Sequence, residues 1–253
     1  MTLDIVTIFP GFFAGPFEYG ILRRAQETGL LRIGIHDLRQ FTTDRHRTVD
    51  DRPFGGEEGM VLKPEPVFEA VERIREQGRA RCRVILLSAQ GRLFRQPLAA
   101  ELAGEEGLLL ICGRYEGVDE RVAERLADEE ISIGDFVLSG GELAAAVVAD
   151  AVARLLPGAL GNAASAVRES FTSPPGQDRV GLLDCPQYTR PATFRDLAVP
   201  DALLSGDHKR IAQWRRRKAM EKTWKNRPDL FSRAVLDEEQ RAWLAELREQ
   251  DRT

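Results

Sequence analysis

Cysteine and histidine are scarce in this chain of 253 residues, and neither is spaced as a metal site or a disulfide framework requires. The three cysteines form no CxxC pair, and an odd number of this kind fits a reducing compartment. The three histidines stand singly, so solvated or locally hydrogen-bonded rings are favoured over zinc ligands. These residues are Cys82, Cys112, Cys185, His36, His46 and His208.

Long apolar runs are also missing, and no basic region precedes the apolar stretch at the start of the sequence. We therefore expect neither a membrane span nor a signal peptide, and we expect a cytoplasmic protein. The formal net charge is −4, so the overall charge does not indicate nucleic acid and any basic surface must be local. With 43% hydrophobic and 30% charged residues, the composition is that of a soluble globular protein.

The common phosphate-binding signatures are absent as well. No GxxxxGK[ST] motif occurs, which argues against a P-loop nucleotidase. No GxGxxG motif follows the first predicted strand, which argues against an ordinary dinucleotide-binding domain. An enzyme that uses another nucleotide cofactor is disfavoured for this reason.

What the sequence does contain is an alternation of short apolar runs with amphipathic segments. This pattern predicts strands at Leu3–Phe9, Leu31–Asp37, Val84–Ser88, Leu108–Cys112 and Ile131–Leu138. It predicts helices at Phe17–Thr28, Pro64–Gln77, Gln96–Ala103, Val118–Ala127 and Gly141–Leu156. Alternating strands and helices indicate βαβ units, so the predicted fold class is α/β with a mostly parallel sheet.

Glycine-bearing loops follow three of these strands. Gly91 follows the run at Val84–Ser88, and Gly113 follows the run at Leu108–Cys112. Gly134, Gly140 and Gly141 lie in and after the last run. Ligands of open α/β sheets bind beyond the carboxyl ends of the strands, and glycine lets the backbone approach another group closely. The three loops therefore predict one shared pocket, although glycine also closes ordinary turns.

Two features have more than one interpretation. The polar, glycine-rich stretch Thr43–Gly59 is either a mobile surface excursion or a functional lid. Asp150 and Arg154 share a side of the predicted helix at Gly141–Leu156. They form either an ordinary surface ion pair or an arginine held by a carboxylate near the pocket.

The texture of the sequence changes after about residue 159, where glycine, proline and serine replace the periodic pattern. We predict a domain at 1–160, a linker or active-site loop at 161–190, and a small helical domain at 191–253. The segment His208–Arg227 is densely basic, contains two tryptophans and follows Asp207, a candidate helix cap. Such a patch on an acidic protein suggests a phosphate-backbone partner rather than only a solvated face. The residues predicted to contact this RNA or DNA backbone are Lys209, Arg215, Lys218 and Lys222.

Several long motifs carry a resemblance over nearly the whole chain. They are IVTIFP at Ile5–Pro10, DDRPFGG at Asp50–Gly56, GM at Gly59–Met60, LLSAQGR at Leu86–Arg92, ICGRYEGVDERV at Ile111–Val122, SIGDFVLSGGE at Ser132–Glu142, LLDCPQYTRP at Leu182–Pro191 and LLSGDHKRIAQWR at Leu203–Arg215. With these motifs the sequence resembles the bacterial tRNA (guanine-N1)-methyltransferases, the TrmD family of the trefoil-knot (SPOUT) class.

The resemblance implies a deep trefoil knot whose loops bind S-adenosylmethionine, a type of chain threading that pattern reasoning does not reveal. It also implies a homodimer with active sites built from both subunits, a helical C-terminal domain that holds tRNA, and the use of magnesium. The methylated atom would be N1 of the guanosine at tRNA position 37, just 3′ of the anticodon. The matching cofactor residues are Leu87, Ser88, Gly113, Tyr115, Glu116, Gly117, Ser132, Ile133, Gly134, Asp135, Phe136, Val137, Leu138, Gly140 and Gly141.

The resemblance also assigns two catalytic roles. A carboxylate would take the proton of guanine N1, and an arginine would stabilise the charge that then builds on O6. The family's arginine matches Arg154, and its aspartate before Ser-Phe is replaced here by Glu169. Asp178, further along the same loop, is the rival base. Because glutamate is one methylene longer, a non-catalytic RNA-binding module remains an alternative.

Overall fold

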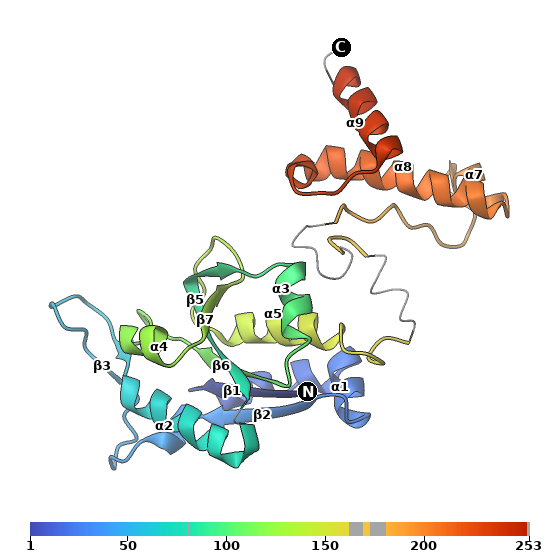
Figure 1. The fold of residues 1–253 in the computed structure, drawn as a ribbon. Coiled ribbons are helices and arrows are strands. Elements are labelled where there is room, and N and C mark those ends of the chain that lie inside the picture. Colours follow the sequence, from blue (N-terminus) through green and yellow to red (C-terminus); the bar gives the residue numbers. More distant parts are fainter. Residues whose placement is uncertain (80, 162–168, 173–180, 252–253) are drawn as a thin grey trace. The chain divides into compact units, whose positions relative to one another are not determined.

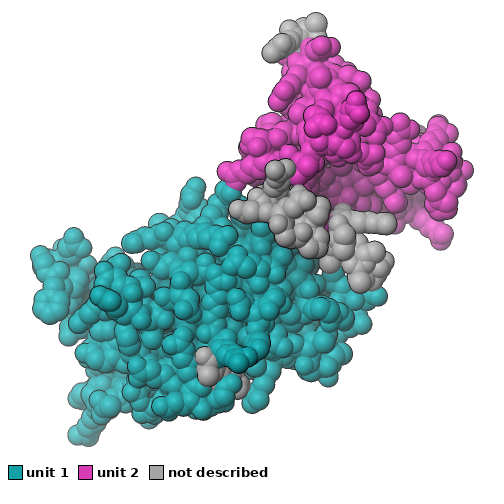
Figure 2. Space-filling model, in the orientation of Figure 1, with its two compact units in different colours: residues 1–163 teal, residues 164–253 magenta. Residues whose placement is uncertain are grey.

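A computed structural model of the protein describes residues 1–79, 81–161, 169–172 and 181–251. The chain divides into two compact units, residues 1–163 and residues 164–253, which we call unit 1 and unit 2 (Figure 2). Asp178 lies outside the described residues.

Unit 1 is built on a sheet of five parallel strands (Figure 1). The strands are β1 (Thr2–Thr7), β2 (Arg32–Asp37), β5 (Cys82–Leu93), β6 (Gly107–Cys112) and β7 (Glu129–Ser132). Their order in the sheet is β2-β1-β6-β5-β7. The predicted α/β class with a mostly parallel sheet is therefore confirmed.

Helices cover both faces of this sheet, because the side chains of a strand alternate between its faces. On β6, Leu108 and Leu110 belong to the same core cluster as buried residues of α1 (Gly20–Glu27), α3 (Gln96–Leu102) and α5 (Glu142–Ala153). Leu109 and Ile111 belong to the cluster that includes residues of α2 (Pro64–Ile74) and α4 (Glu120–Arg125). Figure 1 shows α2 on one side of the sheet and α3 and α5 on the other. Every residue of β6 is buried, which explains its uninterrupted apolar sequence.

Short elements complete unit 1. The antiparallel pair β3 (Asp50–Asp51) and β4 (Val61–Leu62) flanks the glycine-rich loop. Single turns of 3₁₀ helix occur at Pro10–Phe13, Pro16–Glu18 and Leu38–Phe41, and a π turn at Arg75–Arg79 follows α2.

Two predicted elements differ from the structure. The predicted strand Ile131–Leu138 ends at Ser132, because the Ser132 hydroxyl bonds the backbone of Gly134 and the amide of Phe136 closes a tight turn onto the Gly134 carbonyl. Phe136 and Val137 are exposed, and the segment after Ser132 is a loop. The predicted helix Phe17–Thr28 is a 3₁₀ turn followed by α1, since Gly20 has a φ of 61° at the junction.

Unit 2 contains a small hairpin and helices. The elements are β8 (Thr193–Phe194), β9 (Leu197–Ala198), α7 (Asp201–Leu204), α8 (His208–Asn226), the 3₁₀ turn Pro228–Ser232 and α9 (Glu238–Gln250). The Asp207 carboxylate accepts hydrogen bonds from the amides of Lys209 and Arg210 at 2.9 and 3.2 Å, so the predicted helix cap is confirmed. The buried residues Met220, Trp243 and Leu244 join α8 to α9.

Candidate functional site

A large cleft lies at the carboxyl ends of β5, β6 and β7, where the sheet topology predicts ligand binding. Its volume is about 1160 Å³. It brings together the predicted cofactor residues Leu87, Ser88, Gly113, Tyr115, Glu116, Gly117, Ser132, Ile133, Gly134, Phe136, Val137, Leu138, Gly140 and Gly141. Asp135 does not line the cleft; it is exposed in the turn after Gly134. That these residues hold a cofactor stays a prediction.

Backbone hydrogen bonds hold the cleft loops against one another. The Gly141 amide donates to the Gly113 carbonyl at 2.9 Å, which joins the loop after β6 to the loop before α5. Arg114 and Gly140 form an isolated antiparallel bridge beside this bond. At the wall formed by the segment before β4, the Glu116 amide donates to the Met60 carbonyl at 3.0 Å. The cleft is therefore bounded by loops that are fixed to each other.

The polar stretch before β4 takes part in this wall. Asp51, Arg52 and Phe54 line the cleft, and the side chain of Phe54 is fully exposed. The Tyr115 hydroxyl lies near enough to the carboxylate of Asp50 for the two groups to interact. Partial burial and this interaction raise the pKa of Tyr115 above its usual value, so the hydroxyl stays protonated at neutral pH. Of the two interpretations of Thr43–Gly59, a part in the site is the one that the structure favours.

Gly140 and Gly141, in the loop before α5, allow neighbouring segments of the chain to pack closely. A side chain at Gly141 would place its Cβ 2.7 Å from the Cα of Cys112. A Cβ at Gly140 would lie inside contact distance of the Arg114 side chain and 2.6 Å from Glu142 Oε2. These two positions therefore require glycine because loop meets loop, a reason that the sequence pattern does not distinguish from close approach to a ligand.

A buried polar cluster beneath these loops was not predicted from the sequence. Glu142 is only 1% exposed, and its Oε1 accepts a hydrogen bond from the Thr7 hydroxyl at 2.7 Å. Its Oε2 accepts a hydrogen bond from Arg114 Nε at 3.0 Å. The Arg114 guanidinium also lies over the Phe9 ring, 4.6 Å from the ring centroid. The available signal was the recurrence of charged or hydroxyl residues inside otherwise apolar motifs, at Thr7 and at Glu142.

The two predicted catalytic residues belong to different units. Arg154 is the cap residue at the C-terminal end of α5 in unit 1, and its amide donates to the Asp150 carbonyl at 3.2 Å. Glu169 belongs to unit 2 and is partly buried, and its carbonyl accepts from the Thr172 amide at 3.3 Å. Arg154 is placed within unit 1 and Glu169 within unit 2, so their joint action in one active site stays a prediction.

Some cations of the basic helix α8 pair with acidic side chains, and others are exposed without an ion pair among the described residues. Arg216 pairs with Asp237 and Glu239 of the segment at α9, and Arg217 pairs with Glu246. The predicted RNA-contacting residues Lys209, Arg215 and Lys222 are exposed and form no ion pair within the described part of the chain. Lys218 is partly exposed and pairs with Glu221 at 2.5 Å. The two tryptophans of the segment are partly buried, Trp214 against Tyr188 and Trp224 against Phe231.

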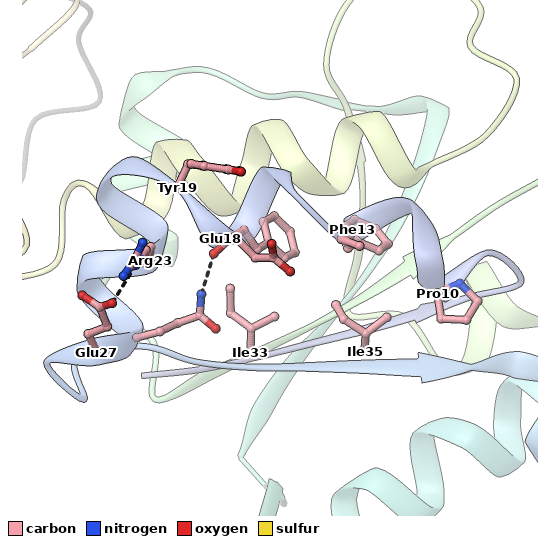
Figure 3. Close-up of a pocket in the computed structure, with 11 residues that line it drawn as sticks. Pro10, Phe13, Glu18, Tyr19, Arg23, Glu27, Ile33 and Ile35 are labelled. Atoms are coloured by element: carbon pink, nitrogen blue, oxygen red, sulfur yellow. Dashed lines mark hydrogen bonds and ion pairs between the residues drawn. The ribbon is translucent and has the colours of Figure 1, made fainter.

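A second hollow of unit 1, of about 630 Å³, lies between β2 and the turns that follow β1 (Figure 3). Phe13, Ile33 and Ile35 line its apolar part, and the Arg23–Glu27 ion pair at 2.6 Å stands at one end. None of the predicted site residues lines it. We therefore assign the predicted chemistry to the cleft beyond β5, β6 and β7.

The described ranges contain neither a metal-ligand cluster nor a membrane-crossing helix. No group of three or more histidine, cysteine, aspartate or glutamate side chains there is arranged to hold a metal ion. No helix among these residues is long and apolar enough to cross a membrane. The three cysteines are buried and form no disulfide.

Comparison with known proteins gives one consistent result. The family model described as tRNA (guanine-1)-methyltransferase TrmD matches residues 1–233. A protein of Koribacter versatilis named tRNA (guanine-N(1)-)-methyltransferase is 59% identical, and the match covers 98% of each chain. Proteins with the same name from Geobacter metallireducens and Geobacillus kaustophilus are each 52% identical, over 98% and 97% of this chain and 98% of each relative. The chain belongs to the tRNA (guanine-1)-methyltransferase family.

Proposed function

We propose that the protein transfers the methyl group of S-adenosylmethionine to N1 of the guanosine at tRNA position 37, next to the anticodon. The observation that carries this proposal is the cleft at the ends of β5, β6 and β7, which gathers the residues that match the family's cofactor motifs. Membership of a family whose curated members carry this activity in their name supports it.

The cleft fits a donor of this size and chemistry. Its volume of about 1160 Å³ is somewhat larger than that of typical small-molecule sites, which is about 300–1,000 Å³, so it has room for a donor of this size. Leu87, Ile133 and Leu138 supply apolar surface, while backbone groups of the surrounding loops supply hydrogen-bonding positions. S-adenosylmethionine would bring an electrophilic methyl group to this site. We further propose that the loops bounding the cleft form the family's deep trefoil knot.

The reaction requires a proton to leave guanine N1 before that nitrogen can attack the methyl group. Glu169 is the proposed general base, and Asp178 is the alternative. Loss of the proton places negative charge on O6, and the Arg154 guanidinium is the proposed group that stabilises it. We assign no step to magnesium, because the described residues offer no cluster of ligands for it.

The remaining assignments follow the same function. Unit 1 would bind the methyl donor, the segment at 161–190 would form the active-site loop, and the helices of unit 2 would hold tRNA through Lys209, Arg215, Lys218 and Lys222. A homodimer is supported by α5, on which Leu143 and Val147 are exposed by 50% and 47% on one side of the helix. A tRNA-modifying enzyme would act in the cytoplasm.

Single-turnover methyl transfer to tRNA tests the proposal. Loss of a general base typically lowers a rate by about 10²–10⁴-fold. We expect such a loss for Glu169→Gln and for Arg154→Ala, little change for Asp178→Asn, and intact donor binding in all three. A loss confined to Asp178→Asn would move the base to that residue. Donor and tRNA binding without any methyl transfer by the wild type would instead indicate a non-catalytic RNA-binding module.

A further inference from the structure

The buried carboxylate of Glu142 lies where three separate chain segments meet. Glu142 is the first residue of α5 and is 1% exposed. Thr7 at the end of β1 donates to its Oε1 at 2.7 Å, and Arg114 from the loop after β6 donates to its Oε2 at 3.0 Å. Both oxygens of the carboxylate are therefore used, one by the sheet and one by a loop of the cleft.

Arg114 extends this connection into the loop before α5. Its Nη1 donates to the Ser139 carbonyl at 3.0 Å, and its backbone bridges Gly140. Gly140 lies directly against the Arg114–Glu142 contact, because a Cβ there would come 2.6 Å from Glu142 Oε2. The loop carrying Gly113 and Tyr115 and the loop carrying Gly140 and Gly141 are thus fixed to the same buried carboxylate.

The backbone beyond Arg114 shows why this support matters for the cleft. Tyr115 has a φ of 60°, which is unusual for a residue other than glycine, and it lines the cleft. Such a conformation persists only where the surrounding structure holds it. Arg114 is adjacent in sequence and is anchored at three places, by Glu142, by Ser139 and by the Phe9 ring.

We infer that Glu142 is a positioning residue for the cleft: through Arg114 it sets the spacing of the two loops that bind the methyl donor. The carboxylate is buried beneath the loops and takes no part in the proton transfer assigned to Glu169. Its role would be to raise donor affinity by holding the loops in their binding arrangement before the donor arrives. This inference rests on the proposed function only in its choice of donor.

The substitution Glu142→Gln tests the inference, because it preserves the shape of the side chain but presents at most one acceptor to two donors. We expect calorimetric affinity for S-adenosylmethionine to fall about 10–100-fold, the range found when the outer support of a metal-binding residue is removed. The single-turnover rate at saturating donor should stay within about threefold of the wild type, since the change affects binding rather than the chemical step.

A matched control separates positioning from a general loss of stability. Val152 lies on the same helix, is 3% exposed, and stands about 15 Å further along the axis at about 1.5 Å per residue. Val152→Ala should lower the thermal unfolding midpoint and leave donor affinity unchanged. If both variants lose affinity in proportion to their loss of stability, the inference is wrong.

The double variant Glu142→Gln with Arg114→Met gives a second test. Replacing both partners of a buried charge pair removes the unpaired buried charge that a single replacement leaves behind. We expect the unfolding midpoint to recover while donor affinity stays low, because the tether between the loops is still missing. Recovery of affinity together with stability would overturn the positioning role.

Hydrogen exchange in the absence of donor keeps this inference separate from the proposed function. The Gly141 amide donates to the Gly113 carbonyl across the two loops. In Glu142→Gln this amide should exchange faster than in the wild type, whereas Val152→Ala should leave it unchanged. Unchanged exchange in Glu142→Gln would refute the tether, whereas a wild type that binds no S-adenosylmethionine would refute the proposed function instead.

Discussion

The basic helix α8 allows a quantitative prediction about tRNA binding. Arg215 and Lys222 are exposed, form no ion pair with a described residue, and are seven positions apart, so they share one face of the helix. Reversing both charges in Arg215→Glu with Lys222→Glu should remove two phosphate contacts. Each contact contributes about 0.9 to the slope of log affinity against log salt on B-form DNA, and the same value applied to tRNA makes the slope shallower by about 1.8.

This change in slope predicts a measurable difference in tRNA affinity between the double variant and the wild type. Raising the salt from about 50 to 200 mM should weaken tRNA binding by the double variant about 12-fold less than it weakens binding by the wild type. Filter binding or fluorescence titration of unmodified tRNA at several salt concentrations measures it. Affinity at the lowest salt should also fall, and affinity for S-adenosylmethionine should not change.

The neighbouring helix supplies the control. Arg241 and Arg248 of α9 are exposed and also seven positions apart, so their double reversal makes the same change in net charge on an acidic helix. That variant should keep most of the wild-type salt slope. Equal losses in the two variants would mean that only overall charge matters, and an unchanged slope in the α8 variant would show that this face does not contact tRNA phosphates.

Three further outcomes are expected. If the proposed homodimer forms through the exposed apolar side of α5, Leu143→Glu, which places a charge there, should sediment as a monomer and the wild type as a dimer; dimers in both would exclude this face. Burial is the main reason why the pKa of each of the three cysteine thiols is raised. A thiol reagent at neutral pH should therefore modify no cysteine until denaturant is added, and modification of the native protein would contradict their burial. Partial burial, with a smaller effect of the nearby Asp50, raises the pKa of Tyr115 above its ordinary value of 10.0, so the folded state should lose stability as pH rises from 10.0 through the raised value. Tyr115→Phe should remove that alkaline dependence of the urea midpoint.

Most elements of unit 1 could be predicted because one simple cause dominates each of them. A strand buried on both faces, such as Leu108–Leu110 in β6, produces an uninterrupted apolar run, and a helix on one face produces a period near 3.6. Ile131–Leu138 shows where this reasoning fails. The apolar run continues past Ser132, but hydrogen bonds of the serine hydroxyl turn the backbone away from the sheet. Periodicity does not report such local side-chain competition.

The cleft residues could be assembled from the sequence because each loop follows a strand, and the carboxyl ends of parallel strands meet at one edge. The structural role of individual cleft residues could not be predicted from the sequence in the same way. Gly140 looks like a ligand-facing glycine, yet its missing side chain makes room for Arg114 and Glu142. The contact between Thr7 and Glu142 joins residues 135 positions apart, and no local pattern relates them. Long-range polar contacts of this kind become visible only in three dimensions.

The division of charge on α8 connects the stability of unit 2 with its proposed RNA surface. The core between α8 and α9 is small, with Met220, Trp243 and Leu244 as its buried residues. Arg216 and Arg217 add ion pairs to the acidic side chains at α9, and both guanidinium groups lie 5.7 Å from the Trp243 ring centroid. Exposed pairs contribute only about 0.2–1 kcal/mol each, and the side of α8 that carries them faces α9.

The side of α8 that faces α9 determines which of its cations remain available to a phosphate backbone. With Arg216 and Arg217 turned towards α9, Arg215 and Lys222 stay exposed without a counter-charge in the described part of the chain. An acidic partner helix therefore neutralises one face of a basic helix and leaves the other face positive. This arrangement explains how a protein with a net charge of −4 can present a local surface suited to a phosphate backbone.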